Sequence, residues 1–220
     1  MKRHFSEELA GLNEKVLRMG GLAERMTHRS IQALVERNEE ILNEVRAMEV
    51  QVNRLHLDID ENCLEILALR QPAAKDLRFI AAAMKINADL ERIGDQAINI
   101  SQRAESLLEV PPLKPLIDIP RMAEIAEGML KESLDAFVNG DADLAYANIR
   151  KDDSVDQLKD QVFRELLTYM ISDPKTIPTA MDLILVSRHI ERVADHATNI
   201  CEDVIFMVKG KDVRHQGPLA

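Results

Sequence analysis

Two copies of one short pattern carry the residues of this sequence that are best suited to chemistry. The stretch DLERIGDQAINI at 89–100 returns at 189–200 as HIERVADHATNI. Its polar residues, spaced four apart, are Glu91, Asp95 and Asn99 in the first copy and Glu191, Asp195 and Asn199 in the second. Helix-forming residues surround both copies, so this spacing predicts a ladder of oxygen ligands along one side of a helix. Carboxylates one turn apart cost a helix roughly a few tenths of a kcal/mol unless a cation lies against them.

A second set of side chains with oxygen ligands, acidic except for one Asn, falls on the middle helix that we expect in each half. Glu49 and Asn53 occupy it in the first half, and Asp152 and Asp156 in the second. Asp, Glu and Asn side chains suit hard cations such as Mg²⁺, Mn²⁺ or Ca²⁺ and can hold iron. Zinc normally recruits His or Cys, and His196 is expected to be a surface or partner-facing histidine. The sequence therefore favours cation binding by the acids, while a merely solvated acidic face remains the alternative.

Composition and charge indicate an all-α protein and argue against a nucleic-acid binder. The 220 residues are 46% hydrophobic and 30% charged but only 3% aromatic, with no Trp, which is typical of an all-α protein. A net charge of -10 argues against a sequence-independent nucleic-acid binder, because such proteins place clustered Lys and Arg against phosphates. It favours cations or basic protein surfaces as partners.

The cysteines and the apolar segments indicate in which cellular compartment the protein works. Cys63 and Cys201 lack C-x-x-C spacing and lie in apolar helical patterns, which predicts buried free thiols in a reducing environment. The sequence near Met1 does not resemble a signal peptide, and no apolar run is long enough to cross a bilayer. We therefore expect a cytoplasmic protein.

Apolar periodicity predicts two related halves. The fold expected is all-α, with two tandem pseudo-symmetric three-helix bundles, six long helices in total, lying side by side. The predicted boundaries are a first repeat at 1–109, a Pro-rich linker at 110–119, a second repeat at 120–209 and a flexible tail at 210–220. Gly20 and Gly21 interrupt the first helix, which indicates either a close approach of helices or a slight kink.

These features together resemble the PhoU family of phosphate-uptake regulators. The resemblance covers nearly the whole chain. It lies in the two three-helix halves, the duplicated E-x-x-x-D, the Gln71-Pro72-x-x-x-Asp76-Leu77-Arg78 break and the run Asp152-Asp153-x-Val155-Asp156. It implies a cytoplasmic, dimeric, all-α protein without catalytic activity, whose E/D-x-x-x-D motifs hold multinuclear metal clusters.

The family role that the resemblance implies is to restrain phosphate uptake and to repress the phosphate-starvation response. The protein would link the ATPase subunit of the phosphate transporter to a sensor histidine kinase and would reach the membrane only through these partners. Glu91/Asp95, Glu191/Asp195 and Asp152/Asp156 match the family's motif, whereas Glu49/Asn53 departs from it. The metal stays open among Mg²⁺, Mn²⁺, iron and Zn²⁺.

Two other readings of the same residues remain. One is a structural helical scaffold with no metal, and the other is a carboxylate-bridged metal hydrolase or oxidase. Ferritin-like di-iron sites use Glu-x-x-His and P-loops use G-x-x-x-x-G-K-[ST], and the sequence contains neither. We therefore expect no enzyme.

Overall fold

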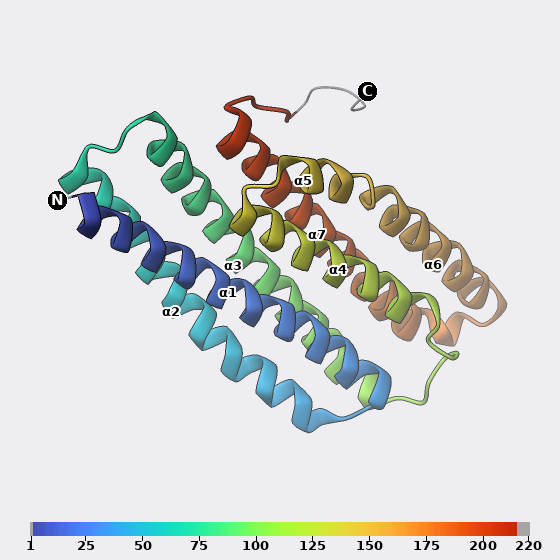
Figure 1. The fold of residues 1–220 in the computed structure, drawn as a ribbon. Coiled ribbons are helices and arrows are strands. Elements are labelled where there is room, and N and C mark those ends of the chain that lie inside the picture. Colours follow the sequence, from blue (N-terminus) through green and yellow to red (C-terminus); the bar gives the residue numbers. More distant parts are fainter. Residues whose placement is uncertain (1, 215–220) are drawn as a thin grey trace.

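The chain is almost entirely helical. The computed structural model describes residues 2–214, with the side chains of 5–214, and in this range it forms seven α-helices, one short 3-10 helix and no strand (Figure 1). The elements are α1 (Lys2–Glu36), α2 (Glu39–Arg70), α3 (Ala74–Leu108), α4 (Asp118–Asn139), α5 (Ala142–Ile149), α6 (Asp152–Ser172), η1 (Pro174–Thr176) and α7 (Ile177–Lys209). The prediction of an all-α fold is confirmed.

The helices form two bundles that share a centre. Helices α1 to α3 make the first bundle and α4 to α7 the second, side by side (Figure 1). The most extensive contact between helices joins α3 to α7, and α1 also packs on α4, so that α2 and α6 lie on the outside. The buried apolar side chains of both halves belong to one continuous core. The predicted side-by-side arrangement is thus present, but the halves are fused through their interiors rather than merely adjacent.

The middle helix of the second half is divided in two. The side chain of Asp141 caps the start of α5 by accepting hydrogen bonds from two backbone N–H groups. Helix α5 then ends at Ile149, and α6 begins at Asp152. The fully buried Asn148 anchors the break, because its Nδ2 donates to the backbone oxygen of Met129 at 2.7 Å. The break places Asp152 in the first turn of α6, where the helix dipole favours a carboxylate.

Close helix approach explains one of the two adjacent glycines. A Cβ atom on Gly20 would lie 2.5 Å from Cδ1 of Leu134, on α4, whereas a Cβ on Gly21 would meet nothing nearer than 3.7 Å. The first of the two sequence-based interpretations therefore applies at Gly20.

The C-terminal segment departs from the expected loose tail over its first part. Gly210 ends α7 in the left-handed conformation, with φ of +67°, and the chain then turns so that Val213 is only 5% exposed against the core. Residues 215–220 lie outside the described residues. No helix in the described range has the length and apolar character that a membrane span needs.

Candidate functional site

The two copies of the repeated stretch lie in α3 and α7, the central pair of helices. Their repeated apolar and small residues have no exposed surface, and this holds for Ile93, Ala97 and Ile100 in α3 and for Val193, Ala197 and Ile200 in α7. The two helices run antiparallel, since Asp89 contacts His196 while Gln96 contacts His189. The apolar and small positions of the duplicated pattern therefore belong to the continuous core.

Two polar contacts cross this interface at exchanged positions. The Nδ1 atom of His196 lies 2.8 Å from an Asp89 carboxylate oxygen, and Nδ1 of His189 lies 2.9 Å from Oε1 of Gln96. The pairs are related by a pseudo-twofold axis between α3 and α7. The expectation that His196 faces the surface or a partner is wrong, because its side chain is only 14% exposed and is held inside the molecule.

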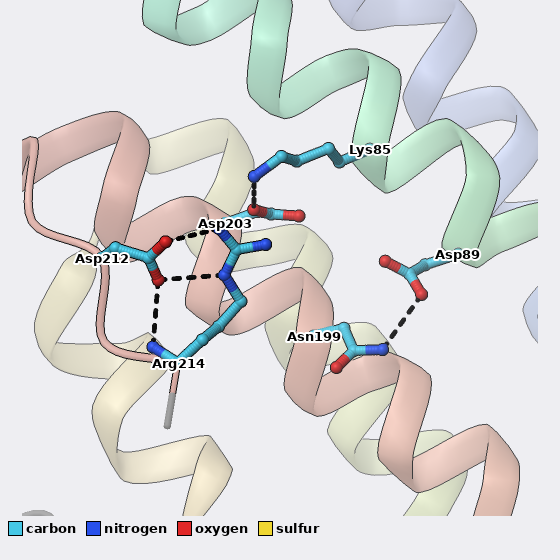
Figure 2. A network of polar contacts seen from close by, with 6 residues as sticks. All are labelled: Lys85, Asp89, Asn199, Asp203, Asp212 and Arg214. Carbon is cyan, nitrogen blue, oxygen red and sulfur yellow. Dashed lines mark hydrogen bonds and ion pairs between the residues drawn. The ribbon is translucent and has the colours of Figure 1, made fainter. Parts of the chain in front are cut away.

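The predicted ladder of three oxygens does not extend to its third member in the second copy. Asn199 instead donates from Nδ2 to the Asp89 carboxylate on α3, at 3.2 Å (Figure 2). Eight residues along a helix amount to more than two full turns, by about 80°, which rotates Asn199 away from Glu191. The oxygen ladder is thus a pair of carboxylates one turn apart.

A group of charged side chains lies where the C-terminal end of α7 packs on α3. Lys85 of α3 donates to the Asp203 carboxylate of α7 at 2.8 Å, and the side chain of Asp203 is only 7% exposed (Figure 2). Burial raises the pKa of Asp203, and the hydrogen bond from Lys85 opposes that rise. Asp212 and Arg214 pair beside it, in the segment that follows α7. This network ties the end of α7 to α3.

The carboxylates of the second half gather along the contact of α6 with α7. We call this group, Asp152, Asp156 and Lys159 of α6 with Glu191 and Asp195 of α7, the second seam. The Lys159 ammonium donates to Asp156 at 2.7 Å and to Glu191 at 3.0 Å. Burial and then Asp195, Asp156 and Glu191 raise the pKa of Asp152 to about 6, and burial and Glu191 raise that of Asp195. The structure thus brings all four predicted acids of this half together.

The first half has a corresponding group between α2 and α3. We call Glu49, Asn53 and His56 of α2 with Glu91 and Asp95 of α3 the first seam. Its register is set by the fully buried Asn87, whose Nδ2 donates to the backbone oxygen of His56 at 3.0 Å and to the carboxylate of Asp60 at 2.9 Å. One and two turns further along, this register places Glu91 beside His56 and Asp95 beside Asn53.

The members of the first seam are not held by other side chains. Within the described residues, no hydrogen bond or ion pair engages the side chains of Glu49, Asn53, Glu91 or Asp95. His56 directs Nε2 toward Asp60 at 3.7 Å, and its buried Nδ1 has no partner there. The oxygen-bearing side chains of the first seam, Glu49, Asn53, Glu91 and Asp95, therefore have no basic group bound to them.

The two seams differ in how well they suit a metal. Among the side chains of 5–214, no group of three or more His, Cys, Asp or Glu is arranged to hold a metal ion. The first seam fits a hard cation by the chemistry of four of its five members, Glu49, Asn53, Glu91 and Asp95, which offer carboxylate and amide oxygens. The second seam does not fit as it stands, because the ammonium of Lys159 lies between the carboxylates of its two helices.

Two cavities of the molecule lie apart from both seams. A cavity of about 630 Å³ opens where the ends of α1, α3, α4 and α7 meet, lined by Phe79 and Phe137 among others. Another of about 210 Å³ lies under the segment between α3 and α4. No carboxylate of either seam lines these cavities.

Sequence reasoning missed the residues that decide the character of each seam. Lys159 and His56 stand at equivalent positions of the repeat, at the offset of 103 that relates the two middle helices. The sequence offers one indication of the role of Lys159. This lysine follows Asp156 by three residues and so lies on the same side of its helix as that acid. The buried thiols were predicted correctly: Cys63 and Cys201 are free and buried, and burial raises the pKa of each to about 12.

Comparison with known sequences relates both halves to one family. The family model described as PhoU domain matches residues 16–104 and again residues 119–204. A protein of Pseudomonas putida named phosphate-specific transport system accessory protein PhoU homolog is 39% identical over 99% of this chain and 85% of its own length. A protein of the same name from Aquifex aeolicus is 43% identical over 96% of this chain and 95% of its own.

Comparison with solved structures points to the same family. The crystal structure of PhoU from Pseudomonas aeruginosa superposes with a TM-score of 0.91 at 39% identity, covering 94% of this chain and all of that one. The phosphate transport system regulatory protein PhoU from Streptococcus pneumoniae superposes with a TM-score of 0.87 at 27% identity, covering 95% of this chain and 99% of its own.

Proposed function

Since the chain belongs to the PhoU family, we propose that it is an accessory protein of a phosphate transport system which restrains phosphate uptake and represses the phosphate-starvation response. One observation carries the proposal: relatives named as accessory proteins of phosphate-specific transport match 99% of the chain, across both halves. The role is regulatory and not catalytic.

The proposed partners are the ATPase subunit of the transporter and a sensor histidine kinase. The protein would act in the cytoplasm and reach the membrane through them. Its net charge of -10 suits basic protein surfaces better than nucleic acid. The outer helices α2 and α6, whose main contacts in the described range are with helices of their own halves, leave long faces available for such partners.

A homodimer is part of the proposal, and α2 has a face suited to it. Val50, Leu57 and Leu64 repeat every seven residues on its outer side and are 63%, 68% and 59% exposed. Antiparallel pairing about Leu57 would bring Arg54 of one chain near Glu61 of the other, as a self-complementary interface requires. Light scattering should show a dimer that Leu57→Glu dissociates. The matched control is Ile171→Glu on α6, which should leave the dimer intact. Survival of the Leu57→Glu dimer would exclude this face.

Metal binding is proposed for the first seam. Glu91 and Asp95 of α3 with Glu49 and Asn53 of α2 would hold the ion, and one divalent cation there would offset two of the three negative charges of the neighbouring carboxylates. Mg²⁺, Mn²⁺, iron and Zn²⁺ are the candidates; oxygen donors favour the first two. Elemental analysis of protein purified without chelator, compared with Glu91→Gln/Asp95→Asn, tests this part separately.

The regulatory proposal is tested in a bacterial strain that lacks its own PhoU protein. Expression of this chain should lower a phosphate-starvation reporter in phosphate-rich medium, and the chain should co-purify with the transporter's ATPase subunit. A reporter that stays fully induced, despite folded protein at normal levels, would sink the proposal.

Two alternatives make different predictions. A purely structural scaffold would contain no stoichiometric metal and would not change the reporter. A metal hydrolase would lose turnover with Glu91→Gln; against it stands the position of both seams outside the cavities described above.

A further inference from the structure

Lys159 stands where a bridging cation would be needed in the second seam. Its Nζ atom donates to Asp156 of its own helix at 2.7 Å and to Glu191 of α7 at 3.0 Å. Only 28% of the Lys159 side chain is exposed, and 21% of that of Glu191. The ammonium thus joins α6 to α7 through two carboxylates, in the way that a bound cation joins ligands from two helices.

The negative charges of the second seam are more stable with a cation beside them. Four carboxylates, those of Asp152, Asp156, Glu191 and Asp195, meet here and repel one another. The Lys159 ammonium supplies a positive charge to this group, in direct contact with two of its four carboxylates.

The duplication supplies an internal comparison. The equivalents of Asp156 and Lys159 in the first half are Asn53 and His56. The second half has thus gained one acid and one base relative to the first, so that both seams carry the same net charge when His56 is neutral. The gained base also reaches Glu191, whereas the equivalent Glu91 has no basic partner among the described side chains.

We propose that Lys159 is the resident cation of the second seam, which holds Asp156 and Glu191 together without a metal ion and keeps divalent cations out. The ammonium occupies the space between the two helices' carboxylates and repels a cation approaching them. The two copies of the E-x-x-x-D motif are therefore not equivalent in this chain. This inference rests on the proposed function only for its expectation about the first seam.

Titration with Mn²⁺ tests the proposal in the full-length protein. Calorimetry should show that Lys159→Gln gains Mn²⁺ binding at least about tenfold tighter than any second-seam binding in the unmodified protein. Adding Glu191→Gln to Lys159→Gln should remove the gain. Lys151→Gln is the control, because Lys151, also in the second half, forms an ion pair at 2.6 Å with Glu132, which is not a member of the seam. That control should leave Mn²⁺ binding unchanged.

The reciprocal exchange separates this inference from the proposed function. His56→Lys should weaken whatever Mn²⁺ binding the first seam has. If the first seam binds no Mn²⁺ but Lys159→Gln gains a site, the metal part of the proposed function fails and the role of Lys159 stands. If Lys159→Gln gains nothing, or the unmodified second seam binds Mn²⁺ as tightly as the first, the role of Lys159 is refuted.

A measurement on the unmodified protein avoids dependence on the folding of variants. Paramagnetic Mn²⁺ broadens nearby amide signals in NMR spectra. At low Mn²⁺ concentration, the amide signals of Glu191 and Asp195 should stay sharp. Selective broadening of those two signals would overturn the proposal.

Discussion

Replacing His189 by Gln should make the stability of the protein less sensitive to acid. The ring lies half-buried at the α3–α7 interface, with Nδ1 against Oε1 of Gln96. Burial, and then Arg192, Arg103 and Arg188, lower the pKa of His189 from 6.5 to about 4. The folded protein therefore holds this imidazole neutral at a pH where the unfolded chain would protonate it.

The sign and size of the effect follow from that difference. Between pH 6.5 and 4 the unfolded chain binds the extra proton, so the free energy of unfolding falls as the pH is lowered. Linkage with these two pKa values gives a loss of about 1.8 kcal/mol between pH 7 and pH 5, and solvent screening of a partly exposed ring reduces it to about 1 kcal/mol. His189→Gln should lack this loss, because glutamine does not titrate and can still donate to Gln96.

Urea unfolding of both proteins at pH 7 and pH 5 measures the difference. Other groups titrate in this range, but they are common to both proteins and cancel in the comparison. The His189 ring signal in an NMR titration gives the pKa directly, and it should lie well below 6.5. If both proteins lose the same stability between the two pH values, the neutral, buried state assigned to His189 is wrong.

Three further predictions concern packing, the interface and the second seam. Gly20→Ala should lower the free energy of unfolding by about 1 kcal/mol through overpacking between α1 and α4, whereas Gly21→Ala, with free space, should raise it by about 0.5 to 1 kcal/mol; equal effects in thermal melts would refute the close approach. Asp89→Ala should cost about 2 kcal/mol, because it leaves two donors on α7 without their acceptor; urea unfolding with an unchanged midpoint would contradict this. Asp152 has a folded-state pKa raised from 3.8 to about 6, so its charge destabilises the fold above pH 6 and not below about pH 4. Asp152→Asn should therefore stabilise the protein at pH 7 by about 1 kcal/mol after screening and much less at pH 4, as melts at the two pH values would show.

Much of the fold could be predicted from local physical chemistry. Apolar residues at intervals of three and four predict long helices wherever they persist, and prolines between Val110 and Pro115 cannot continue one. The repeat relates the halves without any knowledge of their packing. The division of the second half's middle helix into α5 and α6 could not be predicted from the sequence. It involves a hydrogen bond from Asn148 to a backbone acceptor 19 residues earlier in the chain.

The candidate site was predictable in its members but not in its pairings. The spacing of Glu191 and Asp195 determines that both carboxylates point to one side of a helix, since that is a property of helical geometry alone. Spacing within one helix says nothing about the helix opposite. The register between α6 and α7 is what brings Lys159 to Glu191.

The same distinction separates the two faces of the repeated stretch. The sequence by itself determined two all-α halves, their family and the helical faces that carry the acids. Only the tertiary structure decided that His196 and Asn199 face Asp89 inside the molecule, and that the second seam contains its own cation while the first does not. These outcomes depend on contacts between residues about 30 to 110 positions apart, which no local pattern can specify.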